Sequence, residues 1–136
     1  MLSYSHYNGE FDLTENIRIP LSDRSIFFGD GIYDAAIGKD NRIFLLDEHV
    51  QRFLSNAKKL HMQGAPSYSE ITRILQEVIR RAQIPEFFLY FQLTRNAMTR
   101  IHSAADVSSS NLLITVSETS VRQSNTPISL ITEDDR

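Results

Sequence analysis

The sequence has 136 residues, of which 41% are hydrophobic and 23% are charged, with a formal net charge of −3 and no cysteine. These values suit one ordinary soluble domain with its own core. The acidic balance without a basic cluster argues against nucleic-acid binding, and the lack of cysteine excludes disulfides and thiolate metal sites. The first residues lack a secretory signal pattern, and the longest apolar run, 87–91, is too short to span a bilayer. We therefore expect a cytoplasmic protein with no membrane partner.

The first third of the chain predicts short strands joined by tight turns. Asn8 and Gly9 tolerate positive φ, so they predict a two-residue hairpin turn within 4–12. Residues 32–37 and 42–46 are expected to pair as two further strands around a short polar turn.

Two amphipathic helices are predicted in the middle of the chain. Asp47 is expected to cap the first helix, because a carboxylate can accept from orphan amides of the first turn. Ser67 and Glu70 fit a capping box at the start of the second helix, and Pro85 marks its end. Apolar residues at helical spacing are expected to form the buried stripes: Val50, Phe53, Leu54, Ala57 and Leu60, then Ile71, Ile74, Leu75, Val78, Ile79 and Ala82.

Dense runs of β-forming residues follow the helices. Residues 87–93 and 112–116 are expected to be central strands, and they are joined by a polar stretch. Residues 128–132 predict the beginning of another strand, after which the chain ends without completing a second layer.

These elements predict the α+β class, with two helices on a mixed or antiparallel sheet. We assign residues 1–118 to a small N-terminal domain. The polar, turn-rich stretch 119–127 is expected to be an interdomain linker. Residues 128–136 are expected to be the truncated start of a second domain.

Several short motifs carry chemical information through their order and spacing. Taken alone, Gly29-Asp30-Gly31 indicates a tight turn, since no Gly-Lys-Ser/Thr follows as in a phosphate-binding P-loop. The motifs, in order, are NGEF at 8–11, DR at 23–24, GDGIYD at 29–34, LDEHVQRF at 46–53, YFQLTR at 90–95, MTRIH at 98–102 and TEDDR at 132–136. Together they resemble the class IV (fold type IV) aminotransferases, which depend on pyridoxal 5'-phosphate (PLP). Within that family the chain most resembles the N-terminal part of the D-amino-acid (D-alanine) aminotransferases.

The resemblance implies that Arg52 grips the phosphate of PLP. A guanidinium suits this role because it can hold two phosphate oxygens through paired charge-assisted hydrogen bonds. Without the resemblance, a solvated arginine on a helix face is the favoured interpretation of Arg52. His49 is expected to support the site or to pack locally, and Arg95 is interpreted as a structural arginine at a strand end.

The resemblance also implies that Tyr33, Arg100 and His102 bind the substrate's α-carboxylate. Their phenol, guanidinium and imidazole are suitable donors for that group. In the D-amino-acid enzymes the matching arginine and histidine come from the neighbouring subunit, so a homodimer is implied. Singly, each of the three residues could be an ordinary strand or loop side chain. Ile37 departs from the pattern, because those enzymes often have a basic residue there, and Asp34 replaces a more usual glutamate.

No residue of the chain is assigned a catalytic role. The family's lysine forms a Schiff base with PLP, and the only lysines here, Lys39, Lys58 and Lys59, do not match it. We expect that lysine beyond Arg136. The chain is therefore expected to be an N-terminal fragment that is inactive alone and does not hold PLP, and no metal site is predicted.

For the parent enzyme, the resemblance implies transfer of the amino group of a D-amino acid, such as D-alanine, to a 2-oxo acid. Aminodeoxychorismate lyase, which has the same fold and cofactor, stays an alternative. So does a branched-chain aminotransferase, although the Arg100-x-His102 pair argues against it. A non-catalytic binding module is the alternative from another class, and the missing lysine is its support.

Overall fold

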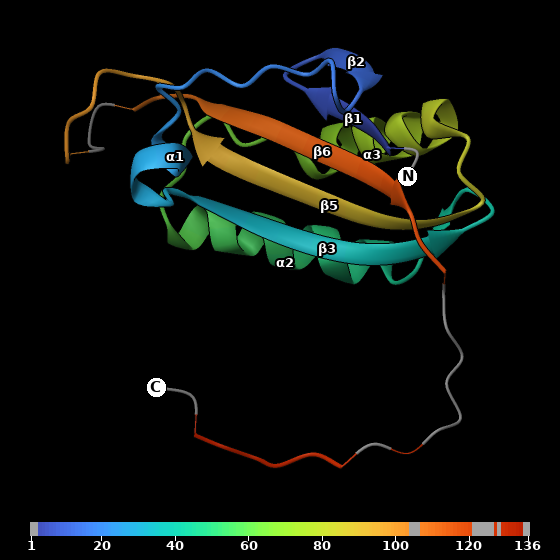
Figure 1. Cartoon of the computed structure of the whole chain (residues 1–136). Helices are drawn as coiled ribbons and strands as arrows, with labels where there is room; N and C mark the ends of the chain where they lie inside the picture. The colour runs from blue at the N-terminus through green and yellow to red at the C-terminus, as the bar shows by residue number, and fades with distance from the viewer. Residues whose placement is uncertain (1–2, 104–106, 121–126, 128, 135–136) are drawn as a thin grey trace.

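A computed structural model describes residues 3–103, 107–120, 127 and 129–134 of the chain. Its centre is a six-stranded sheet with the strand order β2-β1-β6-β5-β3-β4, in which every neighbouring pair is antiparallel (Figure 1). The strands are β1 (Ser3–Tyr7), β2 (Glu10–Leu13), β3 (Gly31–Lys39), β4 (Arg42–Ile43), β5 (Glu86–Arg95) and β6 (Ser110–Glu118). The predicted α+β class is confirmed, and the sheet is antiparallel rather than mixed.

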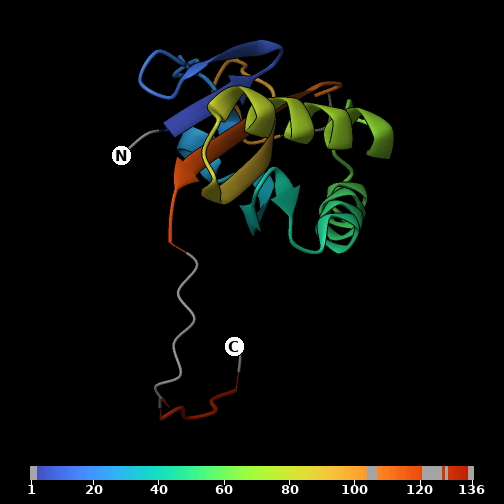
Figure 2. The same ribbon diagram turned by 90° about the vertical axis from the view of Figure 1, so that its right-hand side faces the viewer.

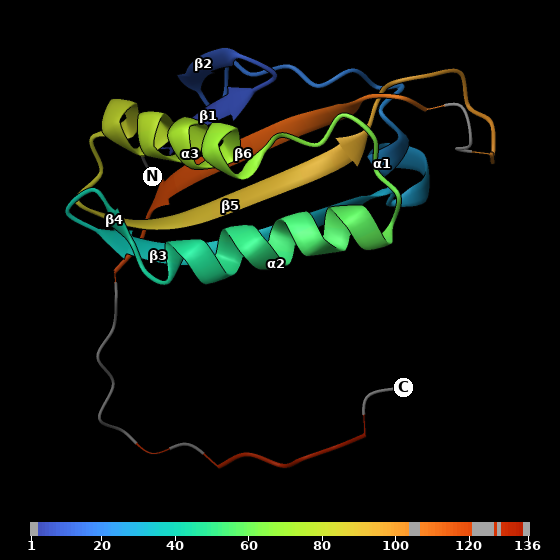
Figure 3. The ribbon, with the colours of Figure 1, turned by 180° about the vertical axis from the view of Figure 1, so that it is seen from behind.

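Two long helices cover one face of this sheet, as predicted. Helix α2 (Leu46–Lys59) runs beside β3, and helix α3 (Tyr68–Ala82) lies against β1 and β6 (Figure 3). The side view shows both helices on the same side of the sheet (Figure 2). A short helix, α1 (Arg24–Phe28), lies at one end of the sheet, next to the start of β3. The opposite face carries neither long helix, and its side chains along β5 range from buried Thr94 through half-buried Tyr90 and Gln92 to exposed Phe88.

The core lies between the sheet and these two helices. Along β5, Phe87, Leu89, Phe91 and Leu93 point into it and are at most 1% exposed, since alternate strand residues share a face. Phe53 of α2 packs on Phe91 with ring centroids 4.8 Å apart. The predicted helical stripes are confirmed at the fully buried positions Val50, Phe53, Ala57, Ile71, Leu75, Val78, Ile79 and Ala82, and Leu54 and Ile74 are partly buried. Leu60 is the exception at 46% exposed, because it caps the end of α2.

Helix starts were predicted with mixed success. The capping box of Ser67 and Glu70 is confirmed, with both reciprocal hydrogen bonds formed at the start of α3. The Asp47 cap is wrong. Leu45 occupies the cap of α2 in the left-handed conformation, and Asp47 lies inside the first turn, where it accepts a hydrogen bond from the Tyr68 hydroxyl. A carboxylate there still opposes the positive end of the helix dipole.

The two predicted turns form where the sequence indicated them. Asn8 and Gly9 have φ of 47° and 97°, and Asp40 and Asn41 have φ of 51° and 62°, which are the left-handed values that two-residue hairpins need. The predicted strand at 42–46 is too long: β4 has two residues, since α2 begins soon afterwards.

The end of the chain has no regular secondary structure in its described residues 119–120, 127 and 129–134. The predicted strand at 128–132 therefore does not form over 129–132, and residue 128 lies outside the described residues. The last part of the TEDDR motif, at 135–136, lies outside them too. The division into a linker and a second domain stays a prediction.

None of the helices in the described ranges combines the length and the apolar character that crossing a membrane requires.

Candidate functional site

Arg52 on α2 forms a two-pronged ion pair with Asp34 on β3. Arg52 Nε donates to Asp34 Oδ2 and Arg52 Nη2 donates to Asp34 Oδ1, each over 2.7 Å. His49, one helical turn before Arg52, places Nδ1 2.8 Å from Asp34 Oδ1. The Asp34 side chain is 3% exposed and the Arg52 side chain 59%. A buried carboxylate therefore holds a guanidinium that faces solvent.

The electrostatics of this pair keep both partners charged. Burial acts to raise the pKa of Asp34, but hydrogen bonds from Arg52, His49 and the Ala35 amide outweigh burial and hold that pKa below its ordinary value. The hydrogen bond to Asp34 raises the pKa of Arg52. Arg52 Nη2 also lies 3.1 Å from His49 Nδ1, so the three side chains contact one another. The neighbouring residues thus fix the direction of the Arg52 guanidinium.

Strand β3 places Tyr33 beside this pair but on the other face of the sheet. Adjacent strand residues point to opposite faces, so Asp34 faces the helices while Tyr33 is 66% exposed on the open face. The Tyr33 ring stacks on Tyr90 with centroids 5.4 Å apart. Because β4 pairs only with Gly38 and Lys39, the edge of β3 over 31–36 has no strand neighbour in the described part of the chain. Tyr33 and Arg52 are both accessible from this free edge.

Arg100 and His102 meet on one aromatic ring at the end of the sheet that carries α1. The guanidinium carbon of Arg100 lies 5.4 Å from the ring centroid of Phe28, and the His102 ring centroid lies 5.4 Å from the same centroid. Both residues are exposed. Among the described residues no hydrogen bond or ring contact joins either of them to Tyr33. The structure therefore brings Arg100 and His102 together and leaves Tyr33 apart.

Asp30 links two arginines beneath this cluster. Its Oδ2 lies 2.7 Å from Arg24 Nε and its Oδ1 lies 2.8 Å from Arg95 Nε. Burial acts to raise the pKa of Asp30, but the hydrogen bonds from Arg24 and Arg95 outweigh burial and lower it. The interpretation of Arg95 as a structural arginine is confirmed.

The two glycines around Asp30 give this turn its shape. Gly29 ends α1 at φ of 62°, where its amide donates to the Ser25 carbonyl. A Cβ on Gly31 would lie 2.7 Å from the Leu93 carbonyl oxygen, so no side chain fits there. Gly29-Asp30-Gly31 is thus the tight turn that the residues alone indicated, and it directs Asp30 toward the two arginines.

The three lysines differ in their surroundings. Lys59 lines a hollow of about 340 Å³ together with Gly31 and Tyr33. Lys39 is paired with Glu86 over 2.6 Å, and the hydrogen bond between them raises the pKa of Lys39. A reactive amine needs a lowered pKa, so this setting opposes such a role. Lys58 and Lys59 are exposed in the last turn of α2. That none of the three serves as a Schiff-base lysine stays a prediction.

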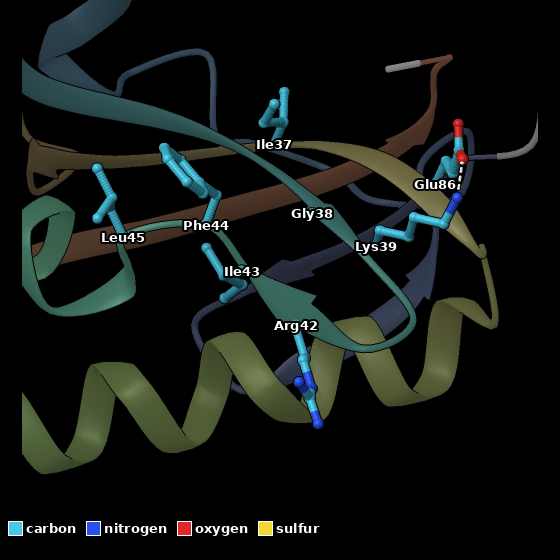
Figure 4. Close-up of a pocket in the computed structure, with 8 residues that line it drawn as sticks. All are labelled: Ile37, Gly38, Lys39, Arg42, Ile43, Phe44, Leu45 and Glu86. Carbon is cyan, nitrogen blue, oxygen red and sulfur yellow. Dashed lines mark hydrogen bonds and ion pairs between the residues drawn. The ribbon is translucent and has the colours of Figure 1, made fainter. Parts of the chain in front are cut away.

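A hollow of about 720 Å³ opens at the hairpin of β3 and β4. Figure 4 shows the Lys39–Glu86 pair at one end of it and Phe44 and Leu45 at the other. Its lining, which also includes Ile37, is mainly apolar apart from Lys39, Arg42 and Glu86. None of the predicted site residues lines it, so the hollow is separate from the groups described above.

The arrangement offers two places for an anion. At the edge of β3, Asp34 holds the Nε and Nη2 side of the Arg52 guanidinium, and Nη1 donates to no group within the described residues. An exposed, fixed guanidinium with a free donor is suited to a phosphate oxygen. Beside α1, Arg100 has no ion pair among the described residues. No group of three or more His, Asp or Glu side chains in this part of the chain is arranged to hold a metal ion.

Sequence reasoning did not identify the supporting carboxylates. Asp34 was noted only for being one methylene shorter than glutamate, and Asp30 only as part of a turn. In each case the only sequence feature that could have indicated the role of the aspartate was the motif that contains it. The partner arginine of Asp34 is 18 residues away, and those of Asp30 are 6 and 65 residues away.

Comparisons with known proteins agree on one family. The sequence model of the class IV aminotransferases matches residues 31–136. A D-alanine aminotransferase of Staphylococcus epidermidis is 31% identical over 96 residues, which are 71% of this chain and 34% of that protein. The D-alanine aminotransferase of Bacillus licheniformis is 29% identical over the same shares. The chain thus spans about a third of the length of these relatives.

Solved structures show the same fold at lower identity. A branched-chain amino acid aminotransferase from T.th., solved with pyridoxamine 5'-phosphate, superposes with a TM-score of 0.81 at 19% identity, over 92% of this chain and 42% of that one. The branched-chain amino acid aminotransferase of Escherichia coli gives a TM-score of 0.79 at 17% identity, over 88% and 40%.

Proposed function

The chain belongs to the class IV aminotransferase family, and from this membership we propose that the protein that carries it transfers the amino group of a D-amino acid, such as D-alanine, to a 2-oxo acid. The observation that carries the proposal is the cluster of Arg100 and His102 on Phe28. It presents a cation and a hydrogen-bonding ring side by side, which a carboxylate can use together. The relatives named D-alanine aminotransferase support the choice of D-amino acids.

PLP is the cofactor we propose, and Arg52 is the residue that would hold its phosphate. The fit rests on the exposed guanidinium, its unused Nη1 donor and the buried Asp34 that fixes its direction. When bound, PLP supplies the electron sink that lets the amino group move. The contribution of Arg52 is to hold one end of the cofactor at the edge of β3, so that the reacting end is placed reproducibly.

We propose that Tyr33, Arg100 and His102 orient the substrate carboxylate. Arg100 would neutralise its charge, while the Tyr33 hydroxyl and the His102 ring would donate hydrogen bonds. Because Tyr33 makes no contact with the other two in the described part of the chain, we propose a homodimer in which they approach it from the partner subunit. Two open surfaces support such packing: the free edge of β3 at 31–36 and the exposed Phe28 cluster.

The test is an amino-transfer assay on the complete protein with PLP. We expect it to convert D-alanine and 2-oxoglutarate to pyruvate and glutamate, with no turnover when the 2-oxo acid is left out. Release of pyruvate from aminodeoxychorismate without an acceptor would establish the lyase instead. Preference for L-leucine or L-valine over D-alanine would establish a branched-chain aminotransferase. If the complete protein turned over none of these substrates, a binding module would be favoured.

A further inference from the structure

We propose that Arg24 is a positioning residue for substrate binding, and that it acts by fixing the backbone from which Arg100 and His102 project. The inference rests on the carboxylate-binding role proposed above for these two residues. Arg24 itself is 4% exposed and cannot reach a substrate. Its effect would be transmitted through the segment at 101–103.

The guanidinium of Arg24 binds three consecutive carbonyl groups of that segment. Nη1 donates to the Ile101 carbonyl over 2.7 Å and approaches the Ser103 carbonyl at 3.4 Å, while Nη2 donates to the His102 carbonyl over 3.2 Å. The segment is irregular, so it has no ladder of strand or helix hydrogen bonds to hold it. A planar fork of donors can organise such a backbone, because each N–H points in a fixed direction.

The side chains of the segment are ordered by the same helix. The Arg24 guanidinium carbon lies 4.7 Å from the Phe28 ring centroid, and Arg100 and His102 contact the same ring at 5.4 Å. Arg24 and Phe28 stand four residues apart on α1, which is one helical turn. One turn of helix therefore fixes the backbone of the segment through Arg24. Through the Phe28 ring it also contacts the side chains of His102 and of Arg100, which directly precedes the segment.

The ion pair of Arg24 also favours this role. Asp30 neutralises Arg24 over 2.7 Å, and hydrogen bonds keep Asp30 ionised. Arg100 has no such partner among the residues that the structure describes. Arg24 is thus held in an ion pair while it binds the segment, and Arg100 supplies the cation for an incoming carboxylate.

Arg95 offers a matched control. It binds the other oxygen of Asp30 over 2.8 Å, so it shares the same buried carboxylate. Its remaining donors go to the carbonyls of Leu60 and His61 at the end of α2, and none goes to 101–103. A variant at Arg95 perturbs the same ion-pair network without touching the segment that carries Arg100 and His102.

The experiment compares Arg24→Lys with Arg95→Lys in the complete enzyme. Lysine keeps the charge beside Asp30 but replaces the fork with one ammonium, which cannot serve three carbonyls. For Arg24→Lys we expect the KM for D-alanine and for the 2-oxo acid to rise about tenfold, with kcat changed by about twofold or less. For Arg95→Lys both KM values should stay within about twofold of the parent. Amide hydrogen exchange should quicken over 100–103 in Arg24→Lys only.

Two further variants keep every outcome decisive. Phe28→Leu leaves the buried ion pair in place and removes the ring that Arg100 and His102 contact, so it should also raise KM. This variant keeps the inference testable if Arg24→Lys fails to fold. Arg100→Ala separates this inference from the proposed function: unchanged KM in that variant would overturn the carboxylate role and with it the reason for Arg24. If Arg100→Ala raises KM while Arg24→Lys and Phe28→Leu do not, or if Arg95→Lys raises KM as much as Arg24→Lys, only the positioning role of Arg24 is overturned.

Discussion

Two aspartate–arginine pairs, Asp34–Arg52 and Asp30–Arg24, have the same shortest separation of 2.7 Å but differ in which partner is accessible. In the first pair the arginine is 59% exposed and the aspartate is buried. In the second pair the side chain of the arginine is only 5% exposed. The difference shows that one kind of ion pair can have two roles. In one the aspartate aims an arginine at a ligand, and in the other the arginine holds a backbone segment whose own side chains face the ligand.

The largest expected effect separates the two pairs by stability. Asp30→Asn leaves buried Arg24 and nearly buried Arg95 without their shared counter-charge, so we expect a loss of about 3 kcal/mol in the free energy of unfolding. Asp34→Asn leaves the mostly exposed Arg52 to water, and the loss should be about 1 kcal/mol or less. Urea denaturation of both variants checks this. Equal losses would mean that the two pairs do not differ in the way their burial indicates.

A second test measures how the free energy of unfolding depends on pH. It separates the contribution of the two aspartate–arginine pairs from that of buried His6. The pKa of buried His6 is lowered from 6.5 to about 4, by burial first and by the charge of Arg73 second. The unfolded chain therefore binds a proton near pH 6.5 and the folded chain only near pH 4, so stability falls as pH drops between these values. We expect a loss on the order of 2 kcal/mol over this window.

His6→Gln should remove that part of the pH dependence and leave the part that belongs to the aspartates. The pKa values of Asp30 and Asp34 lie below the ordinary 3.8, so the stabilisation from both is present above that pH and is lost as pH falls through the folded values. Urea unfolding at about pH 7, 5 and 4 measures the part that belongs to His6. Unfolding below pH 3.8 measures the part that belongs to the two aspartates. An unchanged slope between pH 6.5 and about 4 in His6→Gln would contradict the assignment to His6.

The smallest effect concerns how Asp34 aims Arg52. Asp34→Asn removes the carboxylate charge, so Arg52 loses part of its fixed direction and we expect PLP to bind about fivefold more weakly, or about 1 kcal/mol. Asp30→Asn, assayed below its unfolding temperature, should change PLP affinity by about twofold or less. Titration of the PLP absorbance measures both. PLP affinity that is insensitive to Asp34→Asn would remove the supporting role of this carboxylate.

Local signals in the sequence were enough for much of the fold. The Asn8-Gly9 turn and the Ser67 capping box depend on neighbouring residues, and both formed as predicted. By contrast, the cap of α2 at Leu45 is a backbone conformation that no side chain at Asp47 reveals.

The candidate site also has one part that the sequence indicates and one part that only the folded chain reveals. Arg52 was predicted through its motif, and its partner Asp34 lies on β3, only 18 residues earlier. The contacts of Arg24 with Ile101 and His102 join residues 77 and 78 positions apart. Neither periodicity nor spacing specifies a contact at such a distance, because it depends on how α1 and the segment after β5 meet at the end of the sheet. The role of Arg24 could therefore be inferred only from the folded chain.

We propose that the chain supplies a phosphate anchor, Arg52, and a carboxylate anchor, Arg100, from two separate regions. The most direct test measures the PLP dissociation constant and the KM for D-alanine in both Arg52→Ala and Arg100→Ala of the complete enzyme. We expect Arg52→Ala to weaken PLP binding about 30-fold and Arg100→Ala to raise the KM for D-alanine about 30-fold with PLP affinity nearly unchanged. If Arg100→Ala weakened PLP binding as much as Arg52→Ala, or left the KM for D-alanine unchanged, the division into two anchors would be wrong.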